Sequence, residues 1–175
     1  GEALAYTDPE AGWENASMNS HLTSENSVWT EPRSRAEVRA GSIALRLEEA
    51  TQLDIVRLDD IELFAHLARG SLAVRVRYFE RGEEIVITTP EGRFRIRGNG
   101  RFRIDADAGR RESRITVFEG SASLESSGGT VIVDTGRTVV VTGGERPAWE
   151  YETAVTTAID EWALARDEGY REGQA

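Results

Sequence analysis

The stretch GSIALRL, from Gly41 to Leu47, is repeated along the chain with small changes, and this repetition is the strongest indication of the fold. It returns as GSLAVRV at residues 70–76 and as GSASLES at residues 120–126. In each copy an apolar residue occupies every second position, which is typical of a strand with one buried face. The residues expected to face inward are Ile43, Leu45, Leu47, Leu72, Val74, Val76, Ala122 and Leu124. The glycine before each strand marks a point where the backbone takes a positive φ or closely approaches another segment.

Two shorter alternating segments follow each copy. They are residues 53–58 and 61–68, then 84–89 and 93–98, then 130–135 and 137–142. The resulting blocks are roughly 20 to 30 residues long, a period typical of stacked repeats. The sequence therefore predicts an all-β fold, arranged as a solenoid-like stack or a sandwich of short strands built from degenerate Gly-Ser repeats.

One stretch suggests a hairpin. In RFRIRGNGRFRI, residues 93–104, a two-residue turn at Asn99-Gly100 sets Arg97 opposite Phe102. A three-residue turn at residues 98–100 instead pairs apolar with apolar residues and arginine with arginine. If the two strands are antiparallel neighbours, the pattern therefore favours the longer turn.

Composition divides the chain into three parts. Residues 1–27 are polar and rich in turn-forming residues, so we expect an irregular leading segment with room for one short strand. Residues 28–146 form the predicted β domain. Residues 147–175 form a predicted helical segment that packs on this domain.

The helix is predicted from the spacing of Val155, Ile159 and Trp162, which places them on one face from about Thr153 to Asp167. We expect this single amphipathic helix to cover an open end or edge of the β domain, where strand backbone groups need protection. We also expect the tryptophans to seal the two end segments onto the core. They are Trp13, Trp29, Trp149 and Trp162.

Composition excludes several classes of function. The 175 residues include 31 acidic and 21 basic ones, and the net charge of −10 disfavours nucleic acid and anionic membranes as partners. The absence of cysteine excludes disulfides, thiolate nucleophiles and cysteine-ligated metals. No apolar run approaches the roughly 20 residues of a membrane span. Because the sequence begins at Gly1 without methionine, we expect a processed or cloned segment.

Arginines fall on outward strand positions and form the candidate ligand-binding site. In addition to Arg46, they are Arg75, Arg77, Arg93, Arg95, Arg97, Arg101 and Arg103. On adjacent strands they would make a basic face for an anion, since guanidinium groups match carboxylate and phosphate. The alternative is a solvated face balanced by nearby Glu and Asp. The sequence leaves both interpretations open.

No other motif predicts catalysis, a metal site or a cofactor. Asp105–Gly109 alternates carboxylates like a calcium loop but lacks the later ligands, so a polar turn is the simpler interpretation. His21 and His66 have no second histidine or nucleophile in a recognisable motif. We therefore expect no catalytic residue, no metal, no cofactor and no enzyme activity. A carboxylate hydrolase, the remaining enzymatic alternative, would need two acidic side chains that converge in one cleft.

Four stretches follow one another in a characteristic order. They are VWTEPRSRAEVRAGSIALRLEEATQLDI (28–55), LARGSLAVRV (67–76), ITTPEGRFRIRGNGRFRIDAD (87–107) and ITVFEGSASL (115–124). This order resembles that of the FecR-like periplasmic domain, over about residues 28–142. The resemblance implies an all-β, solenoid-like module without catalysis that is exported to the periplasm or cell envelope. No functional residues of the family can be carried over.

The tail IDEWALARDEGY, residues 159–170, resembles secreted FecR-like bacterial proteins of unknown function. Transmembrane regulators of iron uptake with this domain carry an anti-sigma segment and a membrane helix before it, and the sequence contains neither.

The leading hypothesis is a non-catalytic FecR-like module of the periplasm or cell envelope, acting in protein interaction or signal sensing. Its expected partner is another envelope protein or polymer, with neither nucleic acid nor a membrane span involved. The alternative is a binding domain for an anionic glycan or cell-wall polymer, through the arginine-rich strand face.

Overall fold

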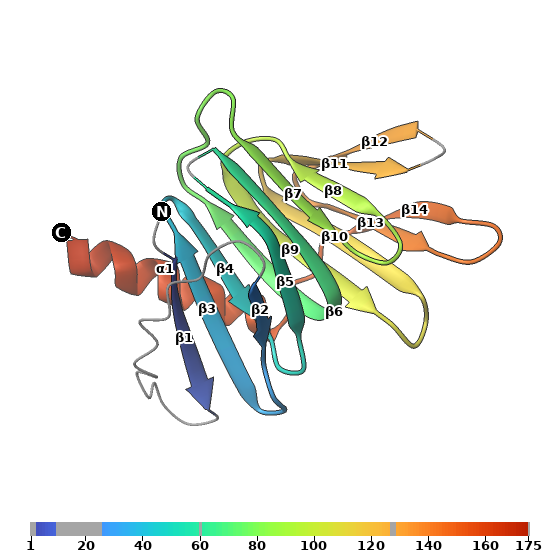
Figure 1. The fold of residues 1–175 in the computed structure, drawn as a ribbon. Helices are drawn as coiled ribbons and strands as arrows, with labels where there is room; N and C mark the ends of the chain where they lie inside the picture. The colour runs from blue at the N-terminus through green and yellow to red at the C-terminus, as the bar shows by residue number, and fades with distance from the viewer. Residues whose placement is uncertain (1–2, 10–25, 60, 127–128, 175) are drawn as a thin grey trace.

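The structure, a computed structural model, describes residues 3–9, 26–59, 61–126 and 129–174. This part of the chain contains fourteen strands and one helix, which confirms the predicted all-β class (Figure 1). The elements are β1 (Ala3–Pro9), β2 (Asn26–Trp29), β3 (Ser34–Ala40), β4 (Ile43–Leu47), β5 (Gln52–Leu58), β6 (Glu62–Val76), β7 (Glu84–Thr88), β8 (Arg93–Ile96), β9 (Gly100–Asp107), β10 (Glu112–Glu119), β11 (Ser121–Ser126), β12 (Gly129–Asp134), β13 (Arg137–Thr142), β14 (Ala148–Thr153) and α1 (Ala158–Gln174).

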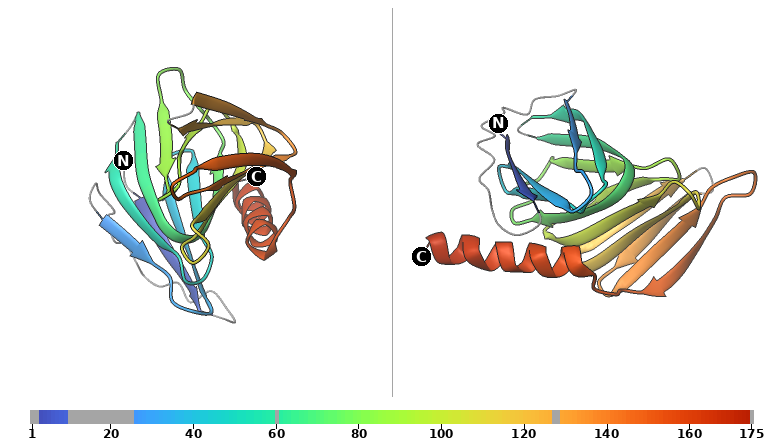
Figure 2. Two further views of the ribbon diagram at one scale, coloured as in Figure 1. Left: turned by 90° about the vertical axis from the view of Figure 1, so that its right-hand side faces the viewer. Right: turned by 90° about the horizontal axis from the view of Figure 1, so that it is seen from below.

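The strands form two sheets that share the long strand β6. Sheet A has the order β1-β3-β4-β6-β9-β10-β13-β14, and sheet B has the order β2-β5-β6-β7-β8-β11-β12. Neighbouring strands are antiparallel except β6 and β7, which are parallel. Residues 62–69 of β6 belong to sheet B and residues 70–76 to sheet A. The two sheets therefore meet at β6 and curl together into a half-barrel (Figure 2).

The inner faces of both sheets enclose one hydrophobic core. Leu72 and Phe102 of sheet A and Ile87 and Phe94 of sheet B are buried in the same cluster. Of the eight residues predicted to face inward, seven are buried and Ile43 is partly buried. The predicted all-β class is therefore correct, whereas the predicted solenoid-like stack or sandwich describes this curled half-barrel only loosely (Figure 2).

The three Gly-Ser steps bend the backbone, as the repeats predicted. Gly41, Gly70 and Gly120 have positive φ angles of 58°, 100° and 102°. Gly41 lies in the tight turn between β3 and β4, where Ala40 pairs with Ile43. At Gly70 the chain passes from sheet B to sheet A, and at Gly120 it passes back. The repeated phrase therefore marks places where the chain turns or changes sheet.

The predicted hairpin over residues 93–104 is wrong, because its two strands lie in different sheets. β8 pairs with β7 and β11 in sheet B, and β9 pairs with β6 and β10 in sheet A. The link between them is fixed by its own contacts, since Asn99 Oδ1 accepts a 2.6 Å hydrogen bond from the Phe79 amide. Both strands turn one apolar face to the common core, so their pattern is the same in either arrangement.

The C-terminal segment also differs from its prediction. The helix begins at residue 158 rather than about 153, and it continues through Gly169 to residue 174. Residues 148–153 form β14, whose alternation of aromatic and acidic residues suits a strand. α1 lies against the outer face of sheet A rather than an end or edge, with Ala73 of β6 packed against Ile159 and Ala163 (Figure 2).

The leading segment contributes one strand, and the described tryptophans differ in their exposure. β1, within the leading segment, pairs with β3, while Trp13 and His21 lie outside the described residues. Trp162 packs against the small apolar contact below α1. Trp29 and Trp149 are 58% and 48% exposed, so the expectation that they seal the ends onto the core is wrong.

Candidate functional site

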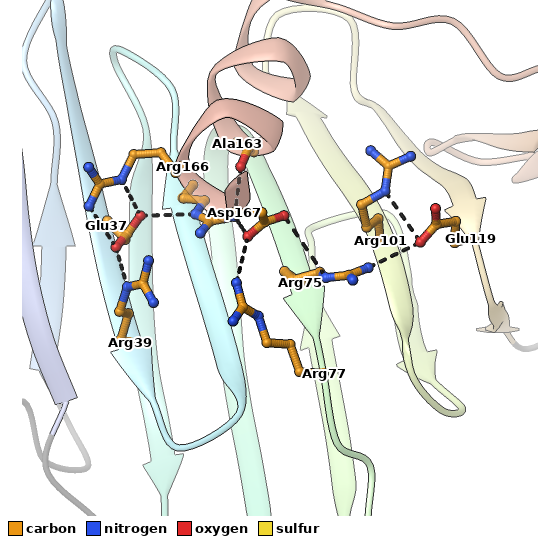
Figure 3. Close-up of polar contacts among 10 residues, drawn as sticks. Glu37, Arg39, Arg75, Arg77, Arg101, Glu119, Ala163, Arg166 and Asp167 are labelled. Atoms are coloured by element: carbon orange, nitrogen blue, oxygen red, sulfur yellow. Dashed lines mark hydrogen bonds and ion pairs between the residues drawn. The ribbon is translucent and has the colours of Figure 1, made fainter. Parts of the chain in front are cut away.

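A layer of charged residues fills the contact between α1 and the outer face of sheet A (Figure 3). Strand alternation turns one set of side chains away from the core, and these lie below the helix. The ion-pair layer consists of Glu37, Arg39, Arg46, Arg75, Arg77, Arg101, Arg103, Asp105, Glu119, Asp160, Arg166 and Asp167. Because the apolar contact at this interface is small, these ion pairs are the main means by which α1 is held.

Glu37 of β3 is the centre of one half of the layer. Its side chain is completely buried and accepts hydrogen bonds from Arg46 Nε (3.0 Å), Arg166 Nε (2.7 Å) and Arg39 Nε (2.5 Å). Burial raises the pKa of Glu37, but the hydrogen bonds from Arg166 and Arg39 and the charge of Arg46 outweigh it and lower the pKa to about 2. Glu37 is therefore ionised and saturated with donors at neutral pH.

Arg46 of β4 connects the sheet to the helix. It is 1% exposed, and its Nη1 donates to Asp167 Oδ1 (2.7 Å) and to the carbonyl oxygen of Ala163 (3.2 Å). Arg77 also approaches Asp167, at 3.5 Å. Arg75 continues the layer, 3.9 Å from Asp167 and 3.1 Å from Glu119.

Arg103 of β9 anchors the start of the helix. Its guanidinium donates to Asp105 (2.9 Å), to Asp160 and to the carbonyl oxygen of Val155 (3.0 Å). Burial lowers the pKa of Arg103, but the carboxylates of Asp105 and Asp160 outweigh it and raise the pKa above its ordinary value. Asp160 also accepts from the Thr157 amide at 2.8 Å, which caps the first turn of α1.

The structure divides the seven predicted site residues between two surfaces. Four lie on or beside sheet A near α1: Arg75, Arg77, Arg101 and Arg103. Arg93, Arg95 and Arg97 belong to β8 and the residue that follows it, on sheet B. Arg93 and Arg95 both bind Glu125, at 3.2 Å and 2.8 Å. The two groups therefore do not form one continuous face, and six of the seven arginines have a carboxylate partner.

Sequence reasoning missed most of the acidic residues of the layer and two of its arginines. The missed residues are Glu37, Arg39, Glu119, Asp160, Arg166 and Asp167. One signal was present: Thr157-x-x-Asp160 is the spacing of a helix capping box. Glu37 also lies in an alternating segment, at a position whose neighbours Ala36 and Val38 are completely buried.

The remaining candidate groups have structural contacts. The expected polar turn after β9 is observed at residues 108–111, and Asp105 accepts a 2.5 Å hydrogen bond from Ser71 Oγ. His66 Nδ1 lies 2.8 Å from Thr88 Oγ1. Among the residues that the structure describes, no cluster of histidine and carboxylate side chains is placed to hold a metal ion. The described helix also lacks the length and hydropathy that crossing a membrane requires.

The fold is similar to that in two crystal structures, each described as a predicted anti-sigma factor from Parabacteroides distasonis. The chain aligns with them at TM-scores of 0.66 and 0.67, with 10% and 9% sequence identity. Each match covers 79% of this chain and 64% of the other, so the chain spans slightly less than two thirds of those proteins. A search of curated proteins found no match.

The FecR protein family model matches residues 26–123. This range begins with β2 and ends within β11, and it includes β6, the strand that both sheets share. It covers more than half of the 175 residues. The chain therefore belongs to the FecR protein family.

Proposed function

We propose that this chain is a non-catalytic regulatory module that senses a signal by binding another protein, in the periplasm or on the outside of a bacterial cell. Membership of the FecR family is the observation that carries the proposal. The similarity in fold to a predicted anti-sigma factor supports it, since such proteins act through protein partners.

The chemistry of the ion-pair layer supports a structural rather than a catalytic role. A general acid or base needs a pKa near the working pH and access to a substrate proton. Glu37, with a pKa of about 2, is buried and bound by three arginines. Arg103 and Asp160 are likewise buried and bound to each other. These groups hold α1 in place and leave the outer surfaces for recognition.

Site-specific photo-cross-linking in the producing bacterium tests the proposal. A photoreactive residue is placed at exposed positions, such as Tyr78 in the loop after β6 and Ile132 in β12 of sheet B. We expect a discrete adduct with one envelope protein from at least one position. Adducts with polysaccharide alone would contradict the proposal, and so would a hydrolytic activity lost on replacing Asp105 with asparagine.

The anion-binding alternative receives less support from the geometry. It requires guanidinium groups that can accept an outside carboxylate or phosphate, and Arg95 already donates to Glu84 (3.1 Å) and Glu125 (2.8 Å). Retention on an anionic polysaccharide column distinguishes an anion-binding domain from a sensing module. If the alternative holds, Arg95→Ala lowers the salt concentration needed for elution, while the sensing module shows no retention to lose.

A further inference from the structure

β14 is the last strand of sheet A and has one unpaired edge within the described part of the chain (Figure 1). All six of its residues are exposed. It pairs with β13 on its other edge, from Arg137 opposite Thr153 to Thr142 opposite Ala148. Unpaired edges of this kind are templates for strand addition by another chain.

The hydrogen bonds to β13 show which backbone groups of β14 are available. The Ala154 amide donates to the Gly136 carbonyl oxygen at 3.0 Å, just beyond the paired strands. In an antiparallel pair, alternate residues bond the same neighbour, so residues 148, 150 and 152 face β13. The amide and carbonyl groups of Trp149, Tyr151 and Thr153 therefore point to the free edge.

Two aromatic side chains of β14 build an ordered surface beside this edge. Trp149 and Tyr151 lie opposite Val141 and Val139, which belong to the core, yet they are 48% and 41% exposed. Their rings meet edge to face, with centroids 5.3 Å apart. The Tyr151 hydroxyl donates to the carbonyl oxygen of Ile132 in β12 at 2.8 Å, which fixes the ring against the last strand of sheet B.

The opposite side of β14 carries Glu150 and Glu152. Glu152 binds Arg114 at 3.1 Å, whereas Glu150 has no ion-pair partner among the described residues. Antiparallel pairing of two copies of β14 about Glu150, Tyr151 or Glu152 sets glutamate directly opposite glutamate, which is destabilising. The charges therefore disfavour a second copy of this chain and favour a basic partner, as does the net charge of −10.

We propose that β14 is a docking strand for an extended segment of another protein. The segment pairs with Trp149, Tyr151 and Thr153 through its backbone, places basic side chains beside Glu150 and Glu152, and packs apolar side chains on the Trp149 ring, since Arg137 already lies 5.0 Å from the centroid of the Tyr151 ring. This inference rests on the proposed function only in expecting a protein partner, and it adds the surface and the chemistry of that partner.

Synthetic peptides test the proposal without the natural partner. A short peptide of alternating arginine and valine is titrated into the full chain, and its counterpart of alternating glutamate and valine is the control. Backbone amide NMR signals report the site. We expect shifts and slower hydrogen exchange at the amides of Trp149, Tyr151 and Thr153, and affinity for the arginine peptide about tenfold higher than for the glutamate peptide.

Two variants distinguish the loss of a backbone hydrogen bond to the peptide from the loss of the Tyr151 side chain. Tyr151→Pro and Tyr151→Val both remove the ring and hydroxyl, but only proline also removes the outward amide, a position where an edge strand tolerates proline. We expect the valine variant to bind the arginine peptide about tenfold more tightly than the proline variant. Glu150→Arg should reduce the preference for the arginine peptide, because Glu152 is then the one acidic residue left on this side of β14.

Three results would overturn the proposal: shifts confined to other strands, equal binding by the proline and valine variants, or an unchanged preference in Glu150→Arg. None of these results would contradict the proposed function, because the peptides test only the free edge of β14. A failed cross-link in the producing cell would instead count against the proposed function and not against the chemistry of the edge.

Discussion

The buried carboxylate of Glu37 shows how one residue can hold an element that has little apolar contact. It neutralises Arg46, whose other end binds Asp167 and the Ala163 carbonyl oxygen. Replacing a buried ion pair by apolar residues is often neutral, but removing one partner leaves a buried, unbalanced charge. The energetic value of Glu37 therefore lies in the groups that depend on it.

Glu37→Gln should lower the free energy of unfolding by about 3 to 5 kcal/mol, because it removes one of the two carboxylates that balance the buried Arg46 and the one that also binds Arg39 and Arg166. Glu125→Gln is the control, since Glu125 likewise binds more than one arginine, Arg93 and Arg95, but is partly exposed. Its expected loss is below about 1 kcal/mol. Denaturant unfolding measures both, and equal losses would show that Glu37 has no special role.

The lowered pKa of Glu37 predicts a specific pH dependence. The pKa is about 2 in the folded chain against an ordinary 4.5, so the ionised form is favoured by folding. Its contribution to stability is present above pH 4.5 and is lost as the pH falls from there towards 2. The stability difference between the wild type and Glu37→Gln should therefore shrink over this interval, and a difference that stays constant would contradict the assignment.

Among the elements, β6 matters most because it belongs to both sheets, and its bend at Gly70 depends on the absence of a side chain. Gly70 has a φ of 100°, and a Cβ atom there would lie 2.6 Å from the Cα of Thr51. A larger residue would have to push β6 away from the segment that joins β4 to β5.

Gly70→Ala should therefore destabilise the chain by about 3 kcal/mol or more, through backbone strain and the clash with Thr51. Gly82→Ala is the control: its φ is 93°, but a Cβ atom would meet nothing within 4 Å. Its expected cost is about 1 kcal/mol. Comparable thermal unfolding of the two variants would argue against the close approach at Gly70.

The start of α1 offers a second test at this scale. Asp160 caps the helix through Thr157 and binds Arg103, so Asp160→Asn should cost about 2 kcal/mol or more. Its neighbour Glu161 is exposed in the same turn, and Glu161→Gln should stay within about 0.5 kcal/mol. Helical circular dichroism during denaturation distinguishes them; equal behaviour would remove the capping role.

The sequence predicts the identity of most strands and the direction of their side chains, because alternation depends only on neighbouring residues. Leu45, Val74 and Leu124 are buried as expected. It does not predict which strands pair. β8 and β9 present the same pattern whether they form a hairpin or separate into two sheets, and the separation depends on contacts distant in sequence, such as Phe79 with Asn99.

For a similar reason, the sequence predicts the arginines of the candidate site but not their carboxylate partners. The arginines are visible as outward positions on strands, but their division between sheets A and B follows from strand pairing. Their carboxylate partners come from other strands and from α1, such as Asp167 for Arg46. Only the start of α1 could be predicted from nearby residues, through the capping-box spacing of Thr157 and Asp160.

For the molecule as a whole, the two sheets and α1 form one unit. β6 joins the sheets through one continuous core, and the ion-pair layer joins α1 to sheet A. The proposed function and the proposed docking strand both need the outer surfaces and the edge at β14 to be presented from one fixed body. This requires α1 to remain docked as long as the sheets are folded.

Native-state hydrogen exchange tests this requirement most directly. The account predicts that amides of α1 between Ile159 and Asp167 open only together with the strands of sheet A, with a similar free energy of opening. It also predicts that Glu37→Gln lowers both by a comparable amount. Rapid exchange throughout α1 while β4, β6 and β9 stay protected would show that the helix is not held by the buried ion pairs, and would contradict the account.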